Sequence, residues 1–171
     1  MKFLRLIPIL FIFFGNFPYK NLVYAETNNP KDYKVFSDNN KTLSISNVEF
    51  FIKEGDTFIK SADFDKAKDS YKDARNLAKQ LASFYLDLNT AFKGVDARIP
   101  NEMQSKGKET LKILAESNER LASLYIKNGK PDVAVPLLIE IIRIMSPNSP
   151  EGKEAYKRLI QLGFVETEYK G

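Results

Sequence analysis

The sequence predicts an all-α fold of about five helices. Between positions 46 and 165, apolar residues recur three and four positions apart, the spacing that keeps side chains on one face of a helix. Capping residues, glycines and prolines divide this part of the chain into segments of helical length. With 171 residues, 43% of them apolar, the chain is long enough for one domain with its own core.

The net charge of +4 arises at the N-terminal end. Lys2, Arg5 and Lys20 lie within the first 25 residues, which contain no acidic residue, and the remainder has 23 basic and 22 acidic residues. Its net charge is therefore only +1. No stretch combines clustered Lys or Arg with aromatic residues, so the sequence predicts no nucleic-acid partner.

The N-terminus has the pattern of an export signal. Lys2 and Arg5 precede an apolar run at residues 6–14, and a small-residue site at residues 23–25 follows. We predict that residues 1–25 are a signal peptide and that the soluble mature protein is exported, to a periplasm or a thylakoid lumen. The alternative is an uncleaved N-terminal membrane anchor, because the stretch before the cleavage site is long and carries Lys20.

A flexible linker and a short tail are predicted to flank the helical domain. Residues 26–45 are rich in Asn, Asp, Lys and Ser and have no apolar period. The helical domain is predicted at residues 46–165, and residues 166–171 form the tail. The chain has no cysteine, so packing alone must stabilise the domain.

The first helix is predicted at residues 47–61. Ser46 and Glu49 have the spacing of a capping box, and Ile45 and Phe50 have that of the accompanying hydrophobic staple. A short turn then leads to the second helix.

The second and third helices are predicted to be long. From Phe64 to Phe92 the apolar steps alternate between three and four residues, with no Gly or Pro, until Gly94 ends the helix. Asn101 and Gln104 resemble a capping box that opens the third helix, which runs to residue 128.

The fourth helix begins near Pro131 and contains the apolar stretch 133–145, interrupted by Pro136. Because this stretch is almost entirely apolar, we expect this helix to be the most buried. Ser149 caps the fifth helix, and Gly163 ends it with a Schellman motif.

An internal repeat relates the first two helices to the third and fourth. Six positions recur 67 residues later: Phe51, Gly55, Phe58, Ala67, Tyr71 and Ala74 correspond to Asn118, Ala122, Tyr125, Ala134, Leu138 and Ile141. The small residues are expected where the two helices of a pair come closest, and the large residues fill the space around them.

This pattern resembles the tetratricopeptide repeat, in which an aromatic residue, Leu-Gly and Tyr in one helix are followed by Ala and an aromatic residue in the next. The resemblance covers about residues 48–78 and 115–148. It departs from the family pattern in that Glu54 replaces the leucine, Asn118 replaces the aromatic residue, and tryptophan is absent. The resemblance implies antiparallel helical hairpins, with the fifth helix as a C-terminal capping helix.

Residues 82–114 lack the small-large pattern of the repeat. We therefore predict that the second and third helices extend beyond the repeats as a projecting antiparallel hairpin. The alternative is a degenerate middle repeat.

The resemblance implies a protein–protein interaction module: a scaffold, or an adaptor of the assembly or chaperone type. Such proteins bind peptides or other proteins in a groove lined by their first helices. The corresponding residues here are Glu49, Ile52, Asp56, Ile59, Lys60, Glu116, Glu119, Ser123, Ile126 and Lys127. The alternative for this stripe is an ordinary solvated helix face.

Two further observations bear on the binding surface. In family members that grip a C-terminal carboxylate the groove supplies Asn and Lys, and Asp56 stands where that Asn would be. This argues against a carboxylate clamp. The projecting hairpin would offer a competing surface, with Phe84, Tyr85, Phe92 and Ile99 as apolar contacts.

No enzyme, cofactor or metal site is predicted. The chain has no His and no Cys, and it lacks a Gly-rich phosphate loop and a serine-nucleophile motif. The interleaved Asp and Lys residues at positions 63–73 are typical of an exposed helix face. Contact with a membrane would require the N-terminal segment to be retained.

The export prediction has a direct test. Because the signal pattern ends at Ala25, N-terminal sequencing of the native protein should find Glu26 as the first residue. An intact Met1 would instead favour the membrane-anchor alternative.

Overall fold

The computed structural model describes residues 43–170, and all regular structure in this range is helical. Its elements are α1 (Ile45–Lys60), α2 (Phe64–Phe92), α3 (Arg98–Lys127), α4 (Pro131–Met145) and α5 (Pro150–Gln161). The predicted all-α class with five helices is therefore confirmed for this range. The predicted signal peptide, most of the predicted linker and the last residue of the tail lie outside the described residues.

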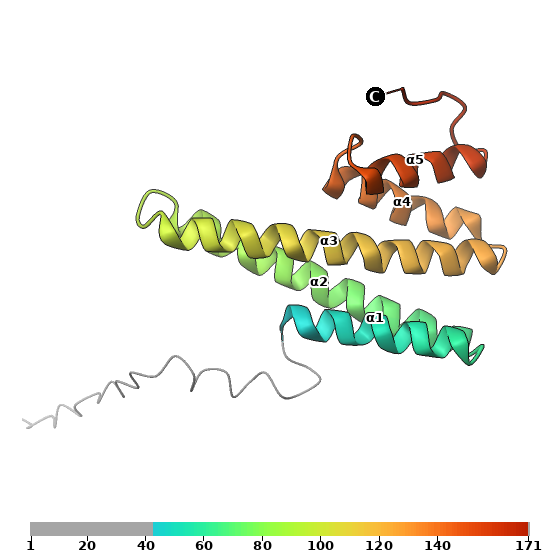
Figure 1. The fold of residues 1–171 in the computed structure, drawn as a ribbon, viewed down its shortest axis with the longest axis horizontal. Coiled ribbons are helices and arrows are strands. Elements are labelled where there is room, and N and C mark those ends of the chain that lie inside the picture. The colour runs from blue at the N-terminus through green and yellow to red at the C-terminus, as the bar shows by residue number, and fades with distance from the viewer. Residues whose placement is uncertain (1–42, 171) are drawn as a thin grey trace, which may run out of the picture. The chain divides into compact units, whose positions relative to one another are not determined.

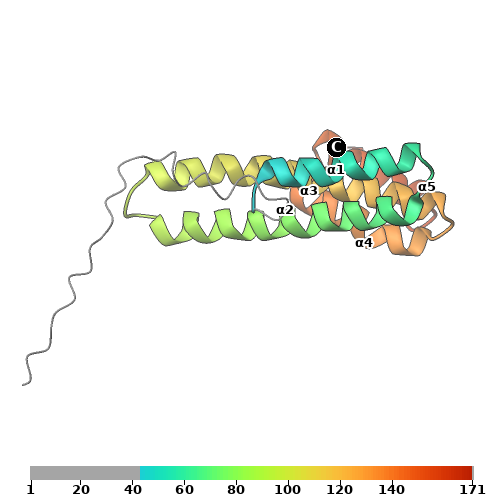
Figure 2. The ribbon, with the colours of Figure 1, turned by 90° about the horizontal axis from the view of Figure 1, so that it is seen from below.

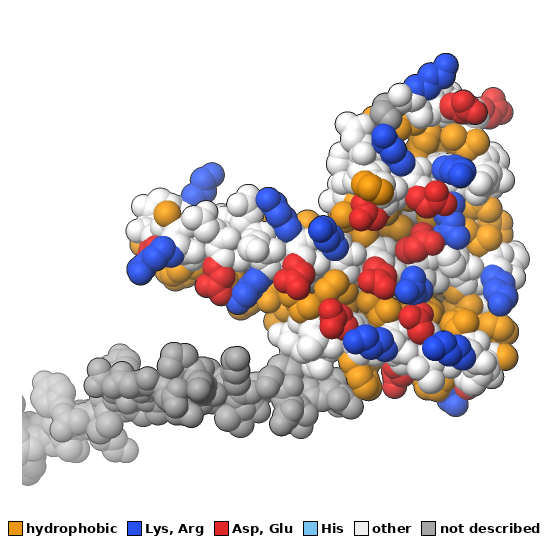
Figure 3. Space-filling view, in the orientation of Figure 1, with side chains coloured by type: hydrophobic (Ala, Val, Ile, Leu, Met, Phe, Trp, Pro, Cys, Tyr) orange, Lys and Arg blue, Asp and Glu red, His pale blue; other side chains and the backbone are white. Residues whose placement is uncertain are grey.

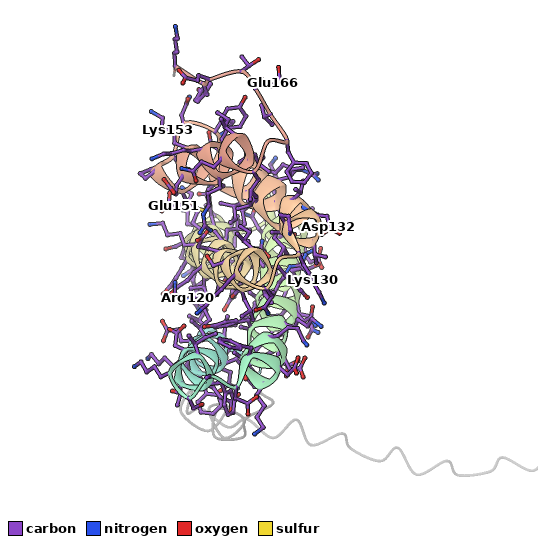
Figure 4. All side chains as sticks on the ribbon, turned by 90° about the vertical axis from the view of Figure 1, so that its right-hand side faces the viewer. Arg120, Lys130, Asp132, Glu151, Lys153 and Glu166 are labelled. Carbon is purple, nitrogen blue, oxygen red and sulfur yellow. The ribbon has the colours of Figure 1, made fainter. Side chains whose placement is uncertain are left out.

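Each helix packs against the next one in the chain and runs antiparallel to it (Figure 1). The helices alternate between two layers. Figure 4 shows α1, α3 and α5 on one side and α2 and α4 on the other, and the view in Figure 2 agrees for α1 to α4. Helix α1 also contacts α3, so neighbouring helices within a layer touch.

Helices α2 and α3 are the longest, with 29 and 30 residues. Both are continuous through the region 82–114 apart from the connection at residues 93–97. Their distal halves extend past the ends of α1 and α4 as an antiparallel arm (Figure 1). The region predicted as a projecting hairpin thus contains no additional helix pair of its own.

The predicted start of α1 is wrong by two residues. Ser44, not Ser46, is the N-cap: its backbone is extended and its Oγ accepts a hydrogen bond from the Asn47 N–H at 3.3 Å. The predicted capping box and staple therefore do not form. Ser44 and Ser46 both precede the apolar stripe, and the chain uses the earlier serine, which lengthens the helix.

The predicted start of α3 is also wrong. The helix begins at Arg98, so Asn101 and Gln104 lie inside it instead of capping it. The Asp96 carboxylate accepts a hydrogen bond from the Arg98 N–H at 2.9 Å just before the helix. Pro100 lies in the first turn, where a helix tolerates the missing N–H.

The glycines predicted to end helices do so. At the end of α5, the Gly163 N–H donates to the Ile160 carbonyl at 2.9 Å and the Phe164 N–H to the Leu159 carbonyl at 3.0 Å. Gly163 has φ of 78°, so these bonds form the predicted Schellman motif.

Small and large residues alternate where paired helices cross. Gly55 of α1 faces the ring of Tyr71 of α2, and a Cβ atom at Gly55 would lie 2.4 Å from Tyr71 Cε1. The equivalent residues of the second pair, Ala122 and Leu138, are fully buried in one core cluster. A larger residue in α3 therefore corresponds to a smaller partner in α4.

Helix α4 is not the most buried helix, contrary to prediction. It buries four of its 15 residues, a share no larger than the nine of 30 that α3 buries. Val133 and Ile139 remain 38% and 43% exposed, because α3 and α5 cover only part of the α4 surface.

A polar network replaces an aromatic residue in the second repeat. Asn118 is fully buried, accepts a hydrogen bond from Arg75 Nε at 2.7 Å and donates one to Glu140 at 3.1 Å. Glu140 also accepts from Arg75 and Lys79, both at 2.7 Å. Burial would raise the pKa of Glu140, but the hydrogen bonds from Lys79 and Arg75 outweigh it and lower the pKa. The network joins α2, α3 and α4.

Gly55→Ala should lower the free energy of unfolding by about 1–3 kcal/mol, because the added methyl group would overlap the Tyr71 ring. At an exposed helix position the same change would stabilise by about 1 kcal/mol. Tyr71→Leu combined with Gly55→Ala recreates the Ala122 and Leu138 pair of the second repeat.

The two single variants and the double variant should be compared by chemical denaturation. We expect the double variant to be more stable than the sum of the single effects predicts, by about 1 kcal/mol. Simple additivity would contradict the proposed complementarity between the two positions.

The Glu140 network predicts a pH-dependent stability. Because the pKa of Glu140 in the folded chain is below its ordinary value of 4.5, its contribution is complete above that value and is lost as the pH falls through the lowered pKa. The stability difference between the wild type and Glu140→Gln should therefore shrink as the pH falls below 4.5.

The matched control is Glu109→Gln, an exposed position of α3 with no salt bridge in the described part of the chain. Urea denaturation at several pH values should give no such trend for it. A stability difference for Glu140→Gln that stays constant with pH would refute the assignment.

Candidate functional site

A groove opens between α3 and α5, on the side of the helical stack formed by α1, α3 and α5. Its volume is about 540 Å³. Its apolar lining comes from Ile113, Ala115, Ile141 and Pro150, and its charged lining from Lys112, Glu116, Glu119, Arg120, Glu151 and Glu154. Figure 3 shows this face and the hollow beside the arm, and Figure 4 places Arg120 and Glu151 on the same side.

The tight turn before α5 precedes the residues that form one wall of the groove, Pro150, Glu151 and Glu154. Ser149 Oγ accepts a hydrogen bond from the Gly152 N–H at 2.9 Å and donates one to the Ser146 carbonyl at the same distance. Gly152 is buried against this turn, and a Cβ atom there would lie 2.0 Å from the Ser146 carbonyl oxygen. The absence of a side chain at this position lets the first turn of α5 pack closely against the turn that follows α4.

A hydrogen-bonded network ties α1 to α3 below the groove. Asp56 Oδ1 accepts hydrogen bonds from the Tyr71 hydroxyl at 2.6 Å and from Arg120 Nε at 3.0 Å. Arg120 also pairs with Glu116 at 3.2 Å. Asp56 is thus occupied by contacts within the chain and is not a free groove ligand.

These contacts set the protonation of the network. Burial and the hydrogen bond to Asp56 raise the pKa of Tyr71 well above its usual range, so its hydroxyl stays a neutral donor. Burial would lower the pKa of Arg120, but the hydrogen bond to Asp56 and the negative charges of Asp56 and Glu116 together outweigh it and raise the pKa. Arg120 therefore stays charged, which suits its role between two carboxylates.

A second ion pair ties α3 to α5. Glu119 Oε1 accepts hydrogen bonds from Arg158 at 2.5 Å and from the Ser123 hydroxyl at 3.0 Å. Arg158 also donates to Ser123 Oγ at 3.0 Å. Two of the predicted groove residues thus hold the two walls at a set distance.

The ten predicted groove residues are not equivalent in the structure. Glu116 and Glu119 line the groove, and Asp56 and Ser123 bond to its lining residues. The remainder do not line it: Glu49, Lys60 and Lys127 are exposed, and Ile59 and Ile126 are half-buried against the core.

The placement of Ile52 in the groove was wrong. Its side chain is only 5% exposed and belongs to the core cluster between α1, α2 and α3. Ile52 is one turn after Val48, so the apolar stripe of α1 includes it.

Sequence reasoning missed the part of the groove that α5 supplies. Pro150, Glu151 and Glu154 come from a helix outside the repeat, and Ile141 from the second helix of a pair. The sequence does contain one indication of this surface. Glu151 and Glu154 are three residues apart, so both lie on one face of α5, the helix that follows α4 as α3 follows α2.

The arm presents a different surface from the one predicted. Phe84 is 44% exposed, but Tyr85, Phe92 and Ile99 are half-buried. A groove of about 400 Å³ lies between the two helices of the arm, with Leu86 and Lys108 among its lining residues.

No group of three or more acidic residues within residues 43–170 is placed to hold a metal ion. None of the helices α1 to α5 is both long enough and apolar enough to cross a membrane. No family model, curated protein or solved structure matches the chain.

Proposed function

We propose that the protein is a tetratricopeptide-like binding module that holds a peptide segment of another protein in the groove between α3 and α5. The observation that carries this proposal is the groove itself. Its volume is about 540 Å³, and it combines an apolar floor with charged side chains at the rim. This volume falls within the roughly 300–1,000 Å³ of typical ligand pockets.

The two-layer arrangement of the helices supports the interpretation as a tetratricopeptide-like protein. Residues 67 positions apart in the sequence occupy equivalent crossings in the α1–α2 and α3–α4 pairs, as Gly55 and Ala122 do. The groove lies on the side of the first helices, where the resemblance implies a binding surface. In this proposal α5 acts as a further first helix and not merely as a cap.

The ion pairs around the groove favour binding over a flexible, nonspecific surface. Arg120 links α3 to α1, and Arg158 links α5 to α3. Walls held in this way lose little conformational freedom when a partner binds, which favours affinity. We place this activity in an exported compartment, a periplasm or a thylakoid lumen, where the protein would act as a scaffold or an assembly adaptor.

Peptide display tests the proposal. Short random peptides displayed on phage and selected on the full chain should include binders that lose roughly tenfold or more in affinity on Lys112→Trp. Lys112 is exposed on the groove rim and has no ion pair in the described residues, so an indole there fills the groove without disturbing the core.

The matched control is Lys108→Trp, one turn earlier on α3 and in the arm groove instead. Binders of the α3–α5 groove should keep their affinity for this variant, and both variants should have the circular dichroism of the wild type. If the selected peptides ignore Lys112→Trp, the groove is not the site. Loss on Lys108→Trp alone would move the site to the arm.

A further inference from the structure

We infer that the groove between α3 and α5 selects a basic segment: a peptide that brings an apolar side chain together with a nearby Lys or Arg. This inference rests on the proposed function and specifies the chemistry of the partner. It follows from which charged groups of the groove are already paired and which are not.

The charged lining is acidic on balance. It comprises four glutamates and two cations: Glu116, Glu119, Glu151, Glu154, Lys112 and Arg120. One of the two cations is not available to a ligand, because Arg120 is shared between Asp56 and Glu116. Among the acids, Glu119 is paired with Arg158.

Glu151 and Glu154 have no ion pair within the described part of the chain. Glu151 lies in the first turn of α5, where a carboxylate interacts favourably with the helix dipole. Glu154 lies one turn further along on the same face, beyond the reach of that effect. The dipole of α5 therefore does not explain why position 154 carries a carboxylate.

The apolar floor makes these carboxylates more effective. Ile113 is half-buried and Pro150 is exposed, and both line the groove, so a bound segment would cover them and exclude water. Electrostatic attraction strengthens when water is excluded, so a cation at the α5 wall would be held more firmly than on an open surface. An arginine could bond a carboxylate through two parallel N–H groups.

The same geometry disfavours acidic partners. An acidic peptide would meet two unpaired carboxylates and a single unpaired cation, Lys112. A carboxylate at the end of a chain would lack the paired donors that such a group needs. The partner is therefore a basic and apolar segment of a protein, with the apolar side chain on the floor and the cation at the α5 wall.

The test uses the peptides selected on the full chain and measures their affinities by fluorescence anisotropy. Peptides that depend on the groove should be enriched in Lys or Arg next to Leu, Ile or Phe. The double variant Glu151→Gln, Glu154→Gln should weaken their binding by roughly tenfold or more, and added salt should weaken binding to the wild type.

The control neutralises the same number of charges elsewhere. Glu109 and Glu166 are exposed, unpaired in the described residues and outside the groove, so Glu109→Gln, Glu166→Gln should bind like the wild type. All four changed residues are exposed, so circular dichroism should show folded protein in both double variants.

Two outcomes would overturn the inference, and they differ in what they leave standing. If the selected peptides are lost on Lys112→Trp but lack Lys and Arg, or bind Glu151→Gln, Glu154→Gln normally, the charge preference is wrong and the groove remains the binding site. If no selected peptide depends on Lys112, both the groove function and its charge preference fall.

Discussion

The antiparallel packing of α2 against α3 is the constraint on which the rest of the helical stack depends. These two helices form the longest contact, and every other helix reaches its place through them: α1 packs on α2, α4 on α3, and α5 on α4. Because both continue past their neighbours, the same seam also forms the arm (Figure 1). The groove lies where α5 returns over α3, so its width depends on how closely α4 packs on α3. The fully buried Ala122 and Ala134 allow that close approach.

Polar contacts then give the apolar packing a defined register. Asn118, Arg75 and Glu140 link three helices, and Asp56, Arg120 and Glu116 link α1 to α3. Among residues 43–170, no buried side-chain nitrogen or oxygen lacks a hydrogen-bond partner. Since an unpaired buried polar group costs about 1–3 kcal/mol, shifting one helix past another would be penalised at several points at once. The walls of the groove are therefore held in place by the same contacts that hold the helices in register.

The helix boundaries show which features of the fold the local sequence pattern predicts and which it does not. The chain offers two serines near the start of α1, and the pattern of hydrophobic and capping residues favoured the wrong one, because Ser44 and Ser46 satisfy similar local rules. The ends were better determined, since a left-handed residue such as Gly129 or Gly163 leaves few alternatives to a helix stop. For α3, the side chain of Asp96 and the tolerance of a first turn for Pro100 allowed an earlier start than the Asn101 signal suggested.

The sequence by itself determined the five helices and the great length of α2 and α3, because apolar spacing, caps and helix-ending glycines act over one or two turns. Only the tertiary structure decided what the groove is made of. Asp56 meets Arg120 across 64 residues and Arg158 meets Glu119 across 39, and no local spacing records either pairing. Folding pairs these charges within the chain and buries Ile52. It also brings α5 over α3, where Glu151 and Glu154 line the groove without an ion pair in the described residues.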